Sequence, residues 1–399
     1  MGTTKNSSKV RLLDLSRTVA RAGRVPSGID RVELAYLREL LSIGLPFYGL
    51  IRTRLGYLLL DTRGAAVLFA AVDSGASQEE CISCARAVAV ARSPRALLGR
   101  LLRRRFGSGL AYVNVGHSNL TRRVLRAVKS TNGGTATILL HDMIPLDFPH
   151  LQRKGRAREF ARRMRRVSRH ADQVVCISLA AQERVAHHLA RFGRVPPILT
   201  APIGAEVVLP DGAALPPDLN LSRPYFVAVG TIEPRKNIGF LLDLWGEMDS
   251  KAPGLFICGS RGWGCEDVFG RLDAGVANVT ELAGLSDPAL SALLSGASAL
   301  LFPSLAEGFG LPPVEAAALG VPVIANDLPS LREILGNRAV YLDVSNPYSW
   351  IEAIKAHEQS PPERDSQAFE PPAWEAHCRK IRPTYGPSWR SFRRAGRNT

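Results

Sequence analysis

The chain has 399 residues, of which 46% are hydrophobic and 22% charged, and its mean hydropathy is zero. This length and composition predict two domains with sizeable cores and exclude a disordered or coiled-coil protein. The net charge of +15 is unevenly distributed, with +21 in residues 1–205 and −6 in residues 206–399. Such an asymmetry indicates that only one half faces an anionic surface.

No segment approaches the roughly 18 consecutive apolar residues that a membrane-spanning helix requires. The opening stretch, MGTTKNSSKVRLLDLS, lacks the long apolar core of a signal peptide. The six cysteines are scattered along the chain, which fits free thiols in a reducing cytosol better than a disulfide framework. The sequence therefore predicts a cytoplasmic protein.

Strand and helix patterns alternate through both halves of the chain. In the first half we expect strands at residues 10–15, 111–115, 135–140 and 173–177, and helices at residues 29–41, 120–128, 156–170 and 179–192. In the second half we expect strands at residues 225–229, 255–258, 299–302 and 321–325, and helices at residues 240–248, 288–296 and 313–319. Strands separated by helices of this length are typical of parallel sheets built from β-α-β units.

A proline- and glycine-rich stretch without periodicity, residues 209–224, separates the two halves. We therefore predict an α/β protein with two Rossmann-like, doubly wound domains, at residues 1–208 and 225–375. A basic tail at residues 376–399 either packs back on the protein or is disordered. Ligands of doubly wound folds bind beyond the carboxyl ends of the strands, so the cleft between the domains is the expected site.

The first functional motif, GTIEPRKN, directly follows the expected strand at residues 225–229. Gly230 allows a sharp turn, and Arg235 and Lys236 are adjacent cations at the mouth of the strand. They precede a helix whose expected N-cap is Asn237. Two cations and a helix N-terminus suit a diphosphate, and the alternative is a solvated turn with ordinary surface charges.

The second motif, LFPSLAEGFGLPPVEA, begins in the expected strand at residues 299–302. Gly308 and Gly310 allow close backbone approach, and the amides of the following helix point at whatever binds there. Glu307 in the loop and Glu315 in the first helical turn are expected to face one cleft, where carboxylates accept hydrogen bonds from vicinal sugar hydroxyls. The alternative for Glu307 is a solvated acid in a loop. The alternative for Glu315 is an acid that stabilises the N-terminus of its helix.

Together with the later segment VPVIANDLPSLREILG, these motifs resemble the retaining nucleotide-sugar glycosyltransferases of family 4. The resemblance is close over residues 225–345 and loose elsewhere. In the first half, SGIDRVE, VGHSNL and HDMIP resemble a subgroup that builds bacterial surface polysaccharides, often from GDP-mannose. The resemblance implies the GT-B fold, in which two Rossmann-like domains face each other across a cleft and the C-terminal domain holds most of the donor.

The resemblance also implies roles for the charged residues of the motifs. Arg235 and Lys236 would neutralise the donor diphosphate, Glu307 would hold hydroxyls of the transferred sugar, and Glu315 would bind the ribose hydroxyls. His141 would line the cleft near the anomeric carbon. The remaining donor contacts would be made by backbone at Gly28, Gly230, Phe309, Gly310 and Leu311.

The expected chemistry follows from the charge that develops when the bond between anomeric carbon and phosphate breaks. Arg235, Lys236 and the helix N-terminus act where negative charge grows. No Asp-x-Asp pair lies in a suitable loop, so we expect no divalent metal and no other cofactor. The resemblance implies that the acceptor hydroxyl attacks the face from which the leaving group departs, and that the diphosphate takes the proton.

Several other residues have competing explanations. His117 either makes a hydrogen bond within its loop or lines the cleft, and Asp142 either touches the acceptor or orients its loop. Cys81 and Cys84 form a C-x-x-C pair without further ligands at metal spacing, so ordinary packing is expected.

The segment from Arg153 to Arg169 contains nine Lys or Arg and one Glu. On a helix, five arginines share one face: Arg158, Arg162, Arg165, Arg166 and Arg169. The basic face of such an amphipathic helix is either solvated, or binds an anionic membrane, or binds nucleic acid. The enzyme motifs favour the membrane, because polysaccharide acceptors are often lipid-linked diphosphates.

We therefore predict a metal-independent hexosyltransferase that moves mannose to a glycan or polyprenyl-diphosphate-linked acceptor at the inner face of the membrane. Nucleic acid is not an expected partner. The alternatives are a basic nucleic-acid-binding protein and another Rossmann-type nucleotide-sugar enzyme. The latter requires a glycine-rich dinucleotide fingerprint, which residues 21–31 lack.

Overall fold

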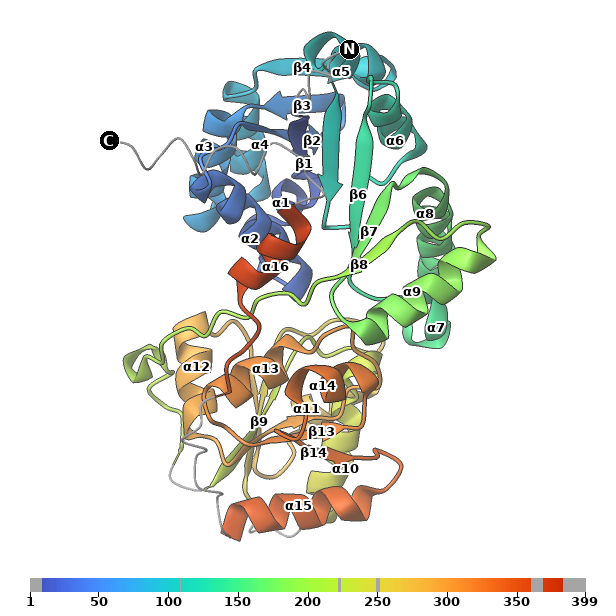
Figure 1. Ribbon diagram of the computed structural model, residues 1–399. Coiled ribbons are helices and arrows are strands. Elements are labelled where there is room, and N and C mark those ends of the chain that lie inside the picture. Colours follow the sequence, from blue (N-terminus) through green and yellow to red (C-terminus); the bar gives the residue numbers. More distant parts are fainter. Residues whose placement is uncertain (1–8, 108, 222–223, 249–251, 360–368, 383–399) are drawn as a thin grey trace, which may run out of the picture.

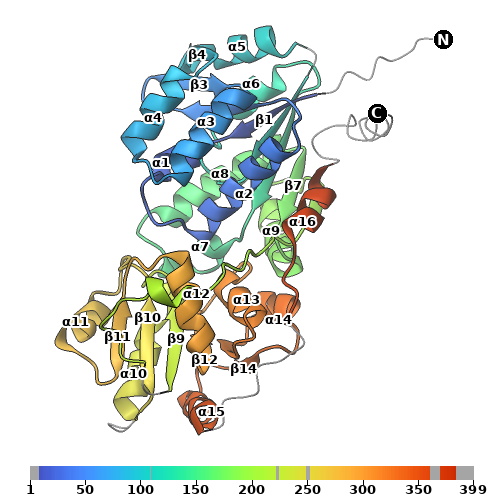
Figure 2. The ribbon, with the colours of Figure 1, turned by 90° about the vertical axis from the view of Figure 1, so that its left-hand side faces the viewer.

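The computed structural model describes residues 9–107, 109–221, 224–248, 252–359 and 369–382. Two α/β domains lie one above the other in Figure 1, each built on a single sheet. The N-terminal sheet has the strand order β4-β3-β2-β1-β5-β6-β7-β8, and the C-terminal sheet has the order β11-β10-β9-β12-β13-β14. Figure 2 shows helices on both faces of each sheet, which is the doubly wound arrangement that the sequence predicted.

The strands of the N-terminal sheet are β1 (Val10–Asp14), β2 (Phe47–Arg52), β3 (Gly56–Leu60), β4 (Ala91–Pro94), β5 (Leu110–Asn114), β6 (Thr135–Leu140), β7 (Gln173–Cys176) and β8 (Ile198–Thr200). Those of the C-terminal sheet are β9 (Tyr225–Val229), β10 (Gly254–Cys258), β11 (Val279–Leu282), β12 (Ala299–Phe302), β13 (Val323–Asn326) and β14 (Val340–Leu342).

The helices of the first domain are α1 (Ser16–Arg21), α2 (Gly28–Ser42), α3 (Thr62–Asp73), α4 (Gln78–Ala87), α5 (Leu98–Arg105), α6 (Arg122–Lys129), α7 (Ile144–Asp147), α8 (Arg156–His170) and α9 (Leu179–Arg191). The later helices are α10 (Ile238–Glu247), α11 (Glu266–Ala274), α12 (Asp287–Gly296), α13 (Leu311–Ala318), α14 (Pro329–Leu335), α15 (Pro347–Gln359) and α16 (Trp374–Ile381). Every strand and helix that we predicted is present, with ends that agree to within two residues.

Both sheets are wound outward from a central pair of strands. In the first domain the chain fills the sheet from β1 to β4 and then returns to place β5 beside β1. In the second it runs from β9 to β11 and returns to place β12 beside β9. The loops that follow β1, β5, β9 and β12 therefore leave the points where the winding reverses, which is where such folds bind ligands.

One edge of the N-terminal sheet departs from the predicted parallel arrangement. β3 pairs antiparallel with both β2 and β4, and none of these three strands was predicted. β2 and β3 form a hairpin in which the Thr53 amide donates to the Gly56 carbonyl at 2.8 Å. A Cβ at Gly56 would lie 2.0 Å from the Ser93 carbonyl oxygen, so the glycine allows β4 to approach. No helix separates β2 from β3, and the alternation that revealed the other strands is therefore missing there.

The hydrophobic cores are continuous between the domains. One cluster of buried side chains contains Leu13 and Val113 of the first domain together with Phe302 and Val314 of the second. Two further clusters lie within single domains. The domains therefore share apolar packing as well as polar loop contacts.

Two expectations about the whole chain concern membranes and metals. Among the described residues, no helix is long and apolar enough to cross a bilayer. Nor does this part of the chain gather three or more His, Cys, Asp or Glu side chains in a group that could hold a metal. All six cysteines are free thiols, as predicted.

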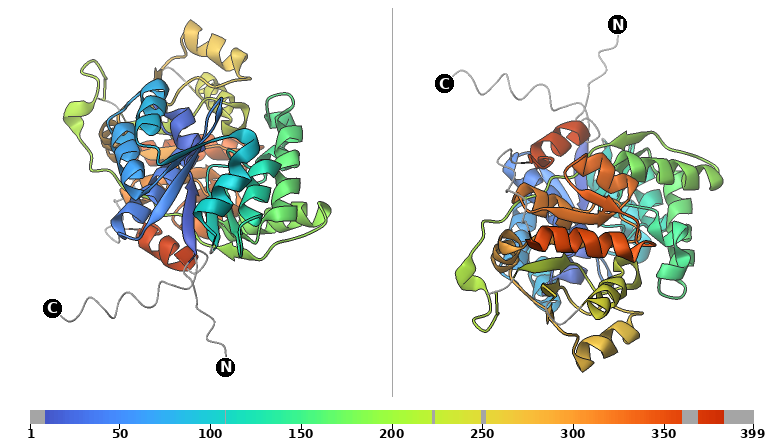
Figure 3. Two further views of the ribbon diagram at one scale, coloured as in Figure 1. Left: turned by 90° about the horizontal axis from the view of Figure 1, so that it is seen from above. Right: turned by 90° about the horizontal axis from the view of Figure 1, so that it is seen from below.

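The chain crosses back to the first domain before α16, as the red helix in Figure 1 shows. The Tyr36 hydroxyl donates to His377 Nε2 at 2.7 Å, and His377 Nδ1 donates to the Ala201 carbonyl at 3.0 Å. The boundary predicted at residue 375 therefore falls inside a helix that packs on the first domain. Residues 383–399 of the predicted tail lie outside the described residues, and Figure 3 shows the red helix α16 beside the blue elements of the first domain.

A glycine controls the docking of α16. A Cβ at Gly204 would lie 2.4 Å from Trp374 Cγ, whereas one at Gly212 meets nothing within 4 Å. We predict that Gly204→Ala destabilises the protein by about 1–3 kcal/mol through overpacking, which lowers the melting temperature by several degrees. Gly212→Ala is the matched control and should melt as the wild type does. Equal melting temperatures for Gly204→Ala and the wild type would show that α16 contributes no stability.

Candidate active site

The first cationic motif lies directly beyond β9. Gly230 has φ +145°, a conformation that side chains rarely adopt, and a Cβ there would lie 3.0 Å from Lys236 Cε. Arg235 and Lys236 lie in a single 3₁₀ turn. Asn237 precedes α10, but it does not cap the helix with its side chain as predicted. It has φ +56°, and its backbone N–H donates to the Pro234 carbonyl.

Arg235, Lys236 and Glu307 form one ion cluster, which we call the Glu307 cluster. Arg235 Nη1 lies 2.6 Å and Lys236 Nζ 2.7 Å from the same oxygen, Glu307 Oε1. Arg235 also contacts Glu233 Oε1 at 2.8 Å and donates to the Ala306 carbonyl at 2.8 Å. The loop beyond β12 is thus held against the turn beyond β9 by charge-assisted hydrogen bonds.

Burial and mutual attraction shift the pKa values of the charged groups in this cluster. Burial alone would raise the pKa of Glu307, but Arg235 and Lys236 outweigh it and hold the pKa below its usual range. Burial lowers the pKa of Lys236 despite the attraction of Glu307. The Lys236 ammonium also lies 4.5 Å from the centre of the Phe302 ring, which favours a cation. The cluster therefore offers preorganised cations with an adjacent carboxylate.

The helix beyond Glu307 begins with a single backbone N–H, that of Leu311, because Pro312 and Pro313 have none. Gly310 has φ +91° and precedes α13, and no side chain caps this helix. Phe309 is buried, which anchors the loop. α13 begins at Leu311, two residues before the predicted start, because proline fits the first turn, where no N–H is needed. Glu315 therefore lies in the second helical turn, and its predicted place in the first turn was wrong.

The Glu307 loop touches the first domain at His141. A Cβ at Gly308 would lie 2.2 Å from the His141 carbonyl oxygen and 3.2 Å from Asp142 Cβ. Ser178 Oγ donates to the Gly308 carbonyl at 2.8 Å. The structure therefore brings His141 and the Glu307 cluster to the same place, from opposite sides of the cleft.

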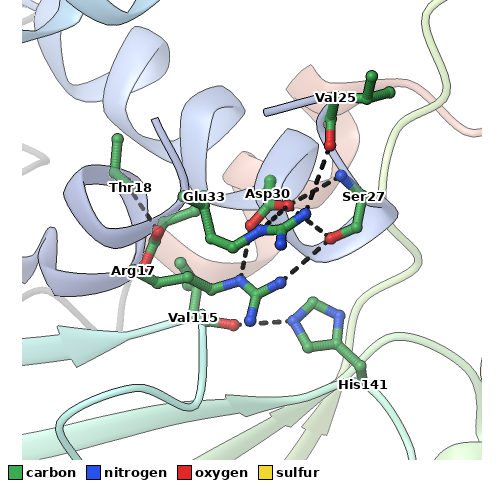
Figure 4. Close-up of polar contacts among 9 residues, drawn as sticks. Arg17, Thr18, Val25, Ser27, Asp30, Glu33, Val115 and His141 are labelled. Atoms are coloured by element: carbon green, nitrogen blue, oxygen red, sulfur yellow. Dashed lines mark hydrogen bonds and ion pairs between the residues drawn. The ribbon is translucent and has the colours of Figure 1, made fainter. Parts of the chain in front are cut away.

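His141 is held as a neutral group at the end of β6. Its Nε2 donates to the Val115 carbonyl at 2.8 Å, and burial lowers its pKa to about 4. In Figure 4 the guanidinium of Arg17 lies beside this ring, and its charge lowers the pKa further. The ring is therefore uncharged at neutral pH.

The two undecided residues, His117 and Asp142, both make backbone contacts. His117 Nε2 donates to the carbonyl of Leu139 in β6 at 2.9 Å, so its hydrogen bond goes to the sheet and not to its own loop as one alternative had it. Burial lowers its pKa well below the usual value. Asp142 accepts from the Ile144 amide at 3.0 Å and so orients the start of α7. Burial raises the pKa of Asp142 to about 6.

Gly28, whose backbone we predicted to contact the donor, is the first residue of α2. The Ser27 amide and hydroxyl both donate to Asp30, at 2.8 and 2.7 Å, and close a capping box. Arg17 Nε donates to the other Asp30 oxygen at 2.7 Å, as Figure 4 shows. A Cβ at Gly28 would lie 3.4 Å from Leu311 Cδ1. The uncapped start of α13 and the start of α2 therefore lie together across the cleft.

Glu315 has a partner that sequence reasoning missed. Arg31, on α2 of the first domain, contacts Glu315 Oε1 at 2.6 Å and Asp287 Oδ1 at 2.9 Å. Burial raises the pKa of Glu315, and Arg31 opposes that rise. The carboxylate expected to bind ribose is therefore engaged by a cation from the opposite domain.

One feature of the sequence, position after a strand, could have pointed to the residues that we missed. Arg17 and Asp30 lie just beyond β1, where doubly wound folds bind ligands, and Arg31 lies within the SGIDRVE segment. Their positions could have been found, but their partners could not. Arg31 and Glu315 are 284 residues apart, and no periodicity connects them.

Comparisons with known proteins agree with this geometry. Residues 216–368 match the family described as glycosyl transferases group 1. The serotype-specific mannosyltransferase WbdA of Escherichia coli is 31% identical over 241 residues, covering 56% of this chain and 30% of WbdA. The O-antigen chain mannosyltransferase RfbU of Salmonella typhimurium is 37% identical over 141 residues, covering 34% of this chain and 39% of RfbU. The matched regions thus span about a third of each relative's length.

Solved structures show the same two-domain architecture. Sucrose-phosphate synthase from Thermosynechococcus elongatus has a TM-score of 0.62 at 16% identity and covers 95% of this chain and 98% of its own. Anabaena HepE, solved with UDP and glucose, has a TM-score of 0.62 at 13% identity over 95% and 97% of the two chains. The chain therefore has the GT-B fold, and its residues 216–368 match the glycosyl transferases group 1 family.

Proposed function

We propose that this chain is a retaining mannosyltransferase that acts in polysaccharide biosynthesis. Its donor would be a nucleotide diphosphate sugar, with GDP-mannose favoured, and its acceptor a glycan or a polyprenyl-diphosphate-linked sugar. The observation that carries the proposal is the Glu307 cluster, which lies at the carboxyl ends of β9 and β12 and faces His141. The relatives named as mannosyltransferases support the choice of sugar.

The proposed chemistry is a displacement at the anomeric carbon. The bond from this carbon to the diphosphate oxygen breaks, a bond to the acceptor oxygen forms on the same face, and the acceptor proton passes to the departing diphosphate. Arg235 and Lys236 act where negative charge accumulates, and so does the uncapped N–H of Leu311. These cations are fixed beforehand by Glu307 and Glu233, so little reorganisation is needed.

Glu307 would exchange partners when the donor binds. The diphosphate replaces part of the cations' contact with Glu307, and sugar hydroxyls donate to the carboxylate instead. The low pKa of Glu307 keeps it an acceptor for these hydroxyls. The same cluster would thus recognise both ends of the bond that breaks.

We also propose that α8 places the protein at the cytoplasmic face of an anionic membrane. Four of the five predicted arginines are exposed or nearly so: Arg158, Arg162, Arg165 and Arg169. Arg166 is directed inward, because its guanidinium donates to the Leu120 carbonyl at 3.1 Å. Arg153 lies over the Trp263 ring of the second domain. A basic nucleic-acid-binding protein is not favoured, because the family match concerns sugar transfer.

Donor choice and the cationic cluster can be tested together. In a thermal-shift panel of GDP-, UDP-, ADP- and dTDP-sugars, GDP-mannose is expected to raise the melting temperature most, since ligand at 100 times its Kd adds about 2.7 kcal/mol. Lys236→Ala or Arg235→Ala should reduce GDP release from GDP-mannose roughly tenfold to more than a hundredfold, because each removes a charge-assisted contact. Arg271→Ala, which breaks an exposed pair with Asp243, is the matched control. Near-wild-type turnover in both cluster variants would remove the diphosphate assignment.

Arg31 is expected to compete with the nucleotide for Glu315. Arg31→Gln should strengthen GDP binding roughly two- to tenfold, since a half-exposed ion pair of modest strength no longer has to be replaced. Glu315→Gln should weaken GDP binding. Arg38→Gln breaks another contact between α2 and a later segment, the exposed pair with Glu206, and serves as the control. Weaker GDP binding by Arg31→Gln in calorimetry would show that Arg31 supports the nucleotide instead.

The membrane proposal predicts a loss of vesicle binding on charge reversal. Replacing Lys154, Arg158 and Arg162 by Glu should weaken sedimentation with phosphatidylserine vesicles by at least a hundredfold, because each basic residue contributes about 1 kcal/mol. Binding should also weaken with salt. The control reverses three exposed cations elsewhere, Lys355, Arg379 and Lys380. If both triple variants sedimented equally, the basic face of α8 would be a solvated surface and not a membrane contact.

A further inference from the structure

A cavity of about 430 Å³ opens on the first domain, among α7, α8 and α9. These three helices lie together at the right of the upper domain in Figure 1. We call it the α8–α9 cavity. Its walls are formed by six side chains: Leu146, Arg165, Arg169, His188, Arg191 and Phe192. Its volume lies within the range of small-molecule sites.

Three arginines converge on this cavity without acidic partners. Arg165 and Arg169 come from α8 and Arg191 from the end of α9, and all three are exposed. Within the described part of the chain, none of them forms an ion pair. Like charges held together in this way repel each other and attract an anion. Guanidinium groups match phosphate oxygens in geometry, since each presents several N–H donors in one plane.

Asp147, the acidic residue at the end of α7, does not neutralise the three arginines. Asp147 is already bound to Arg184, and it accepts a hydrogen bond from His188 Nε2 at 2.7 Å. Burial raises the pKa of Asp147, but the hydrogen bonds from Arg184 and His188 outweigh it and lower the pKa. The contacts also fasten α7 to α9 and hold His188 in the wall. The cavity is therefore both positively charged and built on a fixed frame.

The remaining wall is apolar. Leu146 and Phe192 are partly buried, and the guanidinium of Arg165 lies 5.2 Å from the centre of the Phe192 ring. A cation–π contact of this kind uses the charge of the guanidinium but none of its N–H donors. A site that binds only inorganic phosphate gains nothing from such a surface. A ligand that joins a phosphate to a hydrocarbon chain uses both parts.

We propose that the α8–α9 cavity binds a diphosphate or phosphate ester of a hydrocarbon alcohol. The arginines hold the phosphate, and the first part of the chain lies on Leu146 and Phe192. That this ligand is the acceptor rests on the proposed function, whereas its binding does not. α7 follows Asp142 in the chain and contributes Leu146 to the cavity wall.

The test uses the full chain and soluble compounds, without donor or vesicles. Isothermal titration compares farnesyl diphosphate, inorganic pyrophosphate and farnesol. We expect farnesyl diphosphate to bind at least about tenfold more tightly than pyrophosphate, through the added apolar contact, and farnesol to bind weakly. The variant Arg165→Gln/Arg169→Gln/Arg191→Gln should lose at least about tenfold in affinity for farnesyl diphosphate. Leu146→Ser should lose affinity for farnesyl diphosphate and retain that for pyrophosphate.

The matched control removes the same charge from the same domain outside the cavity. It is Lys154→Gln/Arg158→Gln/Arg162→Gln, and its affinity should stay within about twofold of the wild type, since these side chains are not in contact with the ligand. Melting curves verify that all variants fold. An equal loss in both triple variants would reduce the effect to general charge, and equal affinity for pyrophosphate and farnesyl diphosphate would leave a plain anion site. Either result overturns the proposal. Because no transfer is measured, failure of the mannosyltransferase assignment would not change these outcomes.

Discussion

The contact between Gly308 and the His141 carbonyl determines how the two halves of the site meet. With no side chain at Gly308, backbone approaches backbone across the domains, and the Ser178 hydroxyl of the first domain donates to the Gly308 carbonyl. Glu307 is the neighbouring residue, so its carboxylate is positioned by the same contact. Lys236 follows, because it is bound to that carboxylate. One absent Cβ thus fixes the distance between a neutral histidine and a pair of cations.

Electrostatics in the cleft is organised as ion pairs that a ligand can exchange. Arg235 and Lys236 are bound to Glu307, and Arg31 is bound to Glu315. Each pair keeps its charges from facing a low-dielectric surface alone, which would be costly. Under the proposed function, the phosphates and hydroxyls of the donor have to offer better contacts than the protein's own groups. The proposed donor affinity is then a difference between two sets of interactions, so that removal of a competing cation strengthens binding.

Much of the fold could be predicted from the sequence, because the central strands are short apolar runs separated by amphipathic helices. The positions of Arg235, Lys236 and Glu307 followed from the same pattern, since each comes directly after a buried strand. β2 and β3 escaped prediction because no helix separates them, and β4 escaped it because its sequence, ARSP, is not an apolar run. Partners such as Arg31 and Glu315 depend on how the domains face each other, and local periodicity carries no information about that. The left-handed backbone of Asn237 likewise reflects a 3₁₀ turn that propensity alone does not reveal.

The return of α16 to the first domain has a consequence for biosynthesis. Tyr36 and Ala201 meet His377 only after the whole second domain has left the ribosome, since that domain lies between Ala201 and His377 in the chain. Chains are made at about 5–20 residues per second, and domains generally fold in order of synthesis. The first domain would therefore emerge with a patch of its surface, including Gly204, still uncovered for about ten seconds or more. When α16 docks, the chain is held to the first domain at a second place, which restricts how far the finished cleft can open.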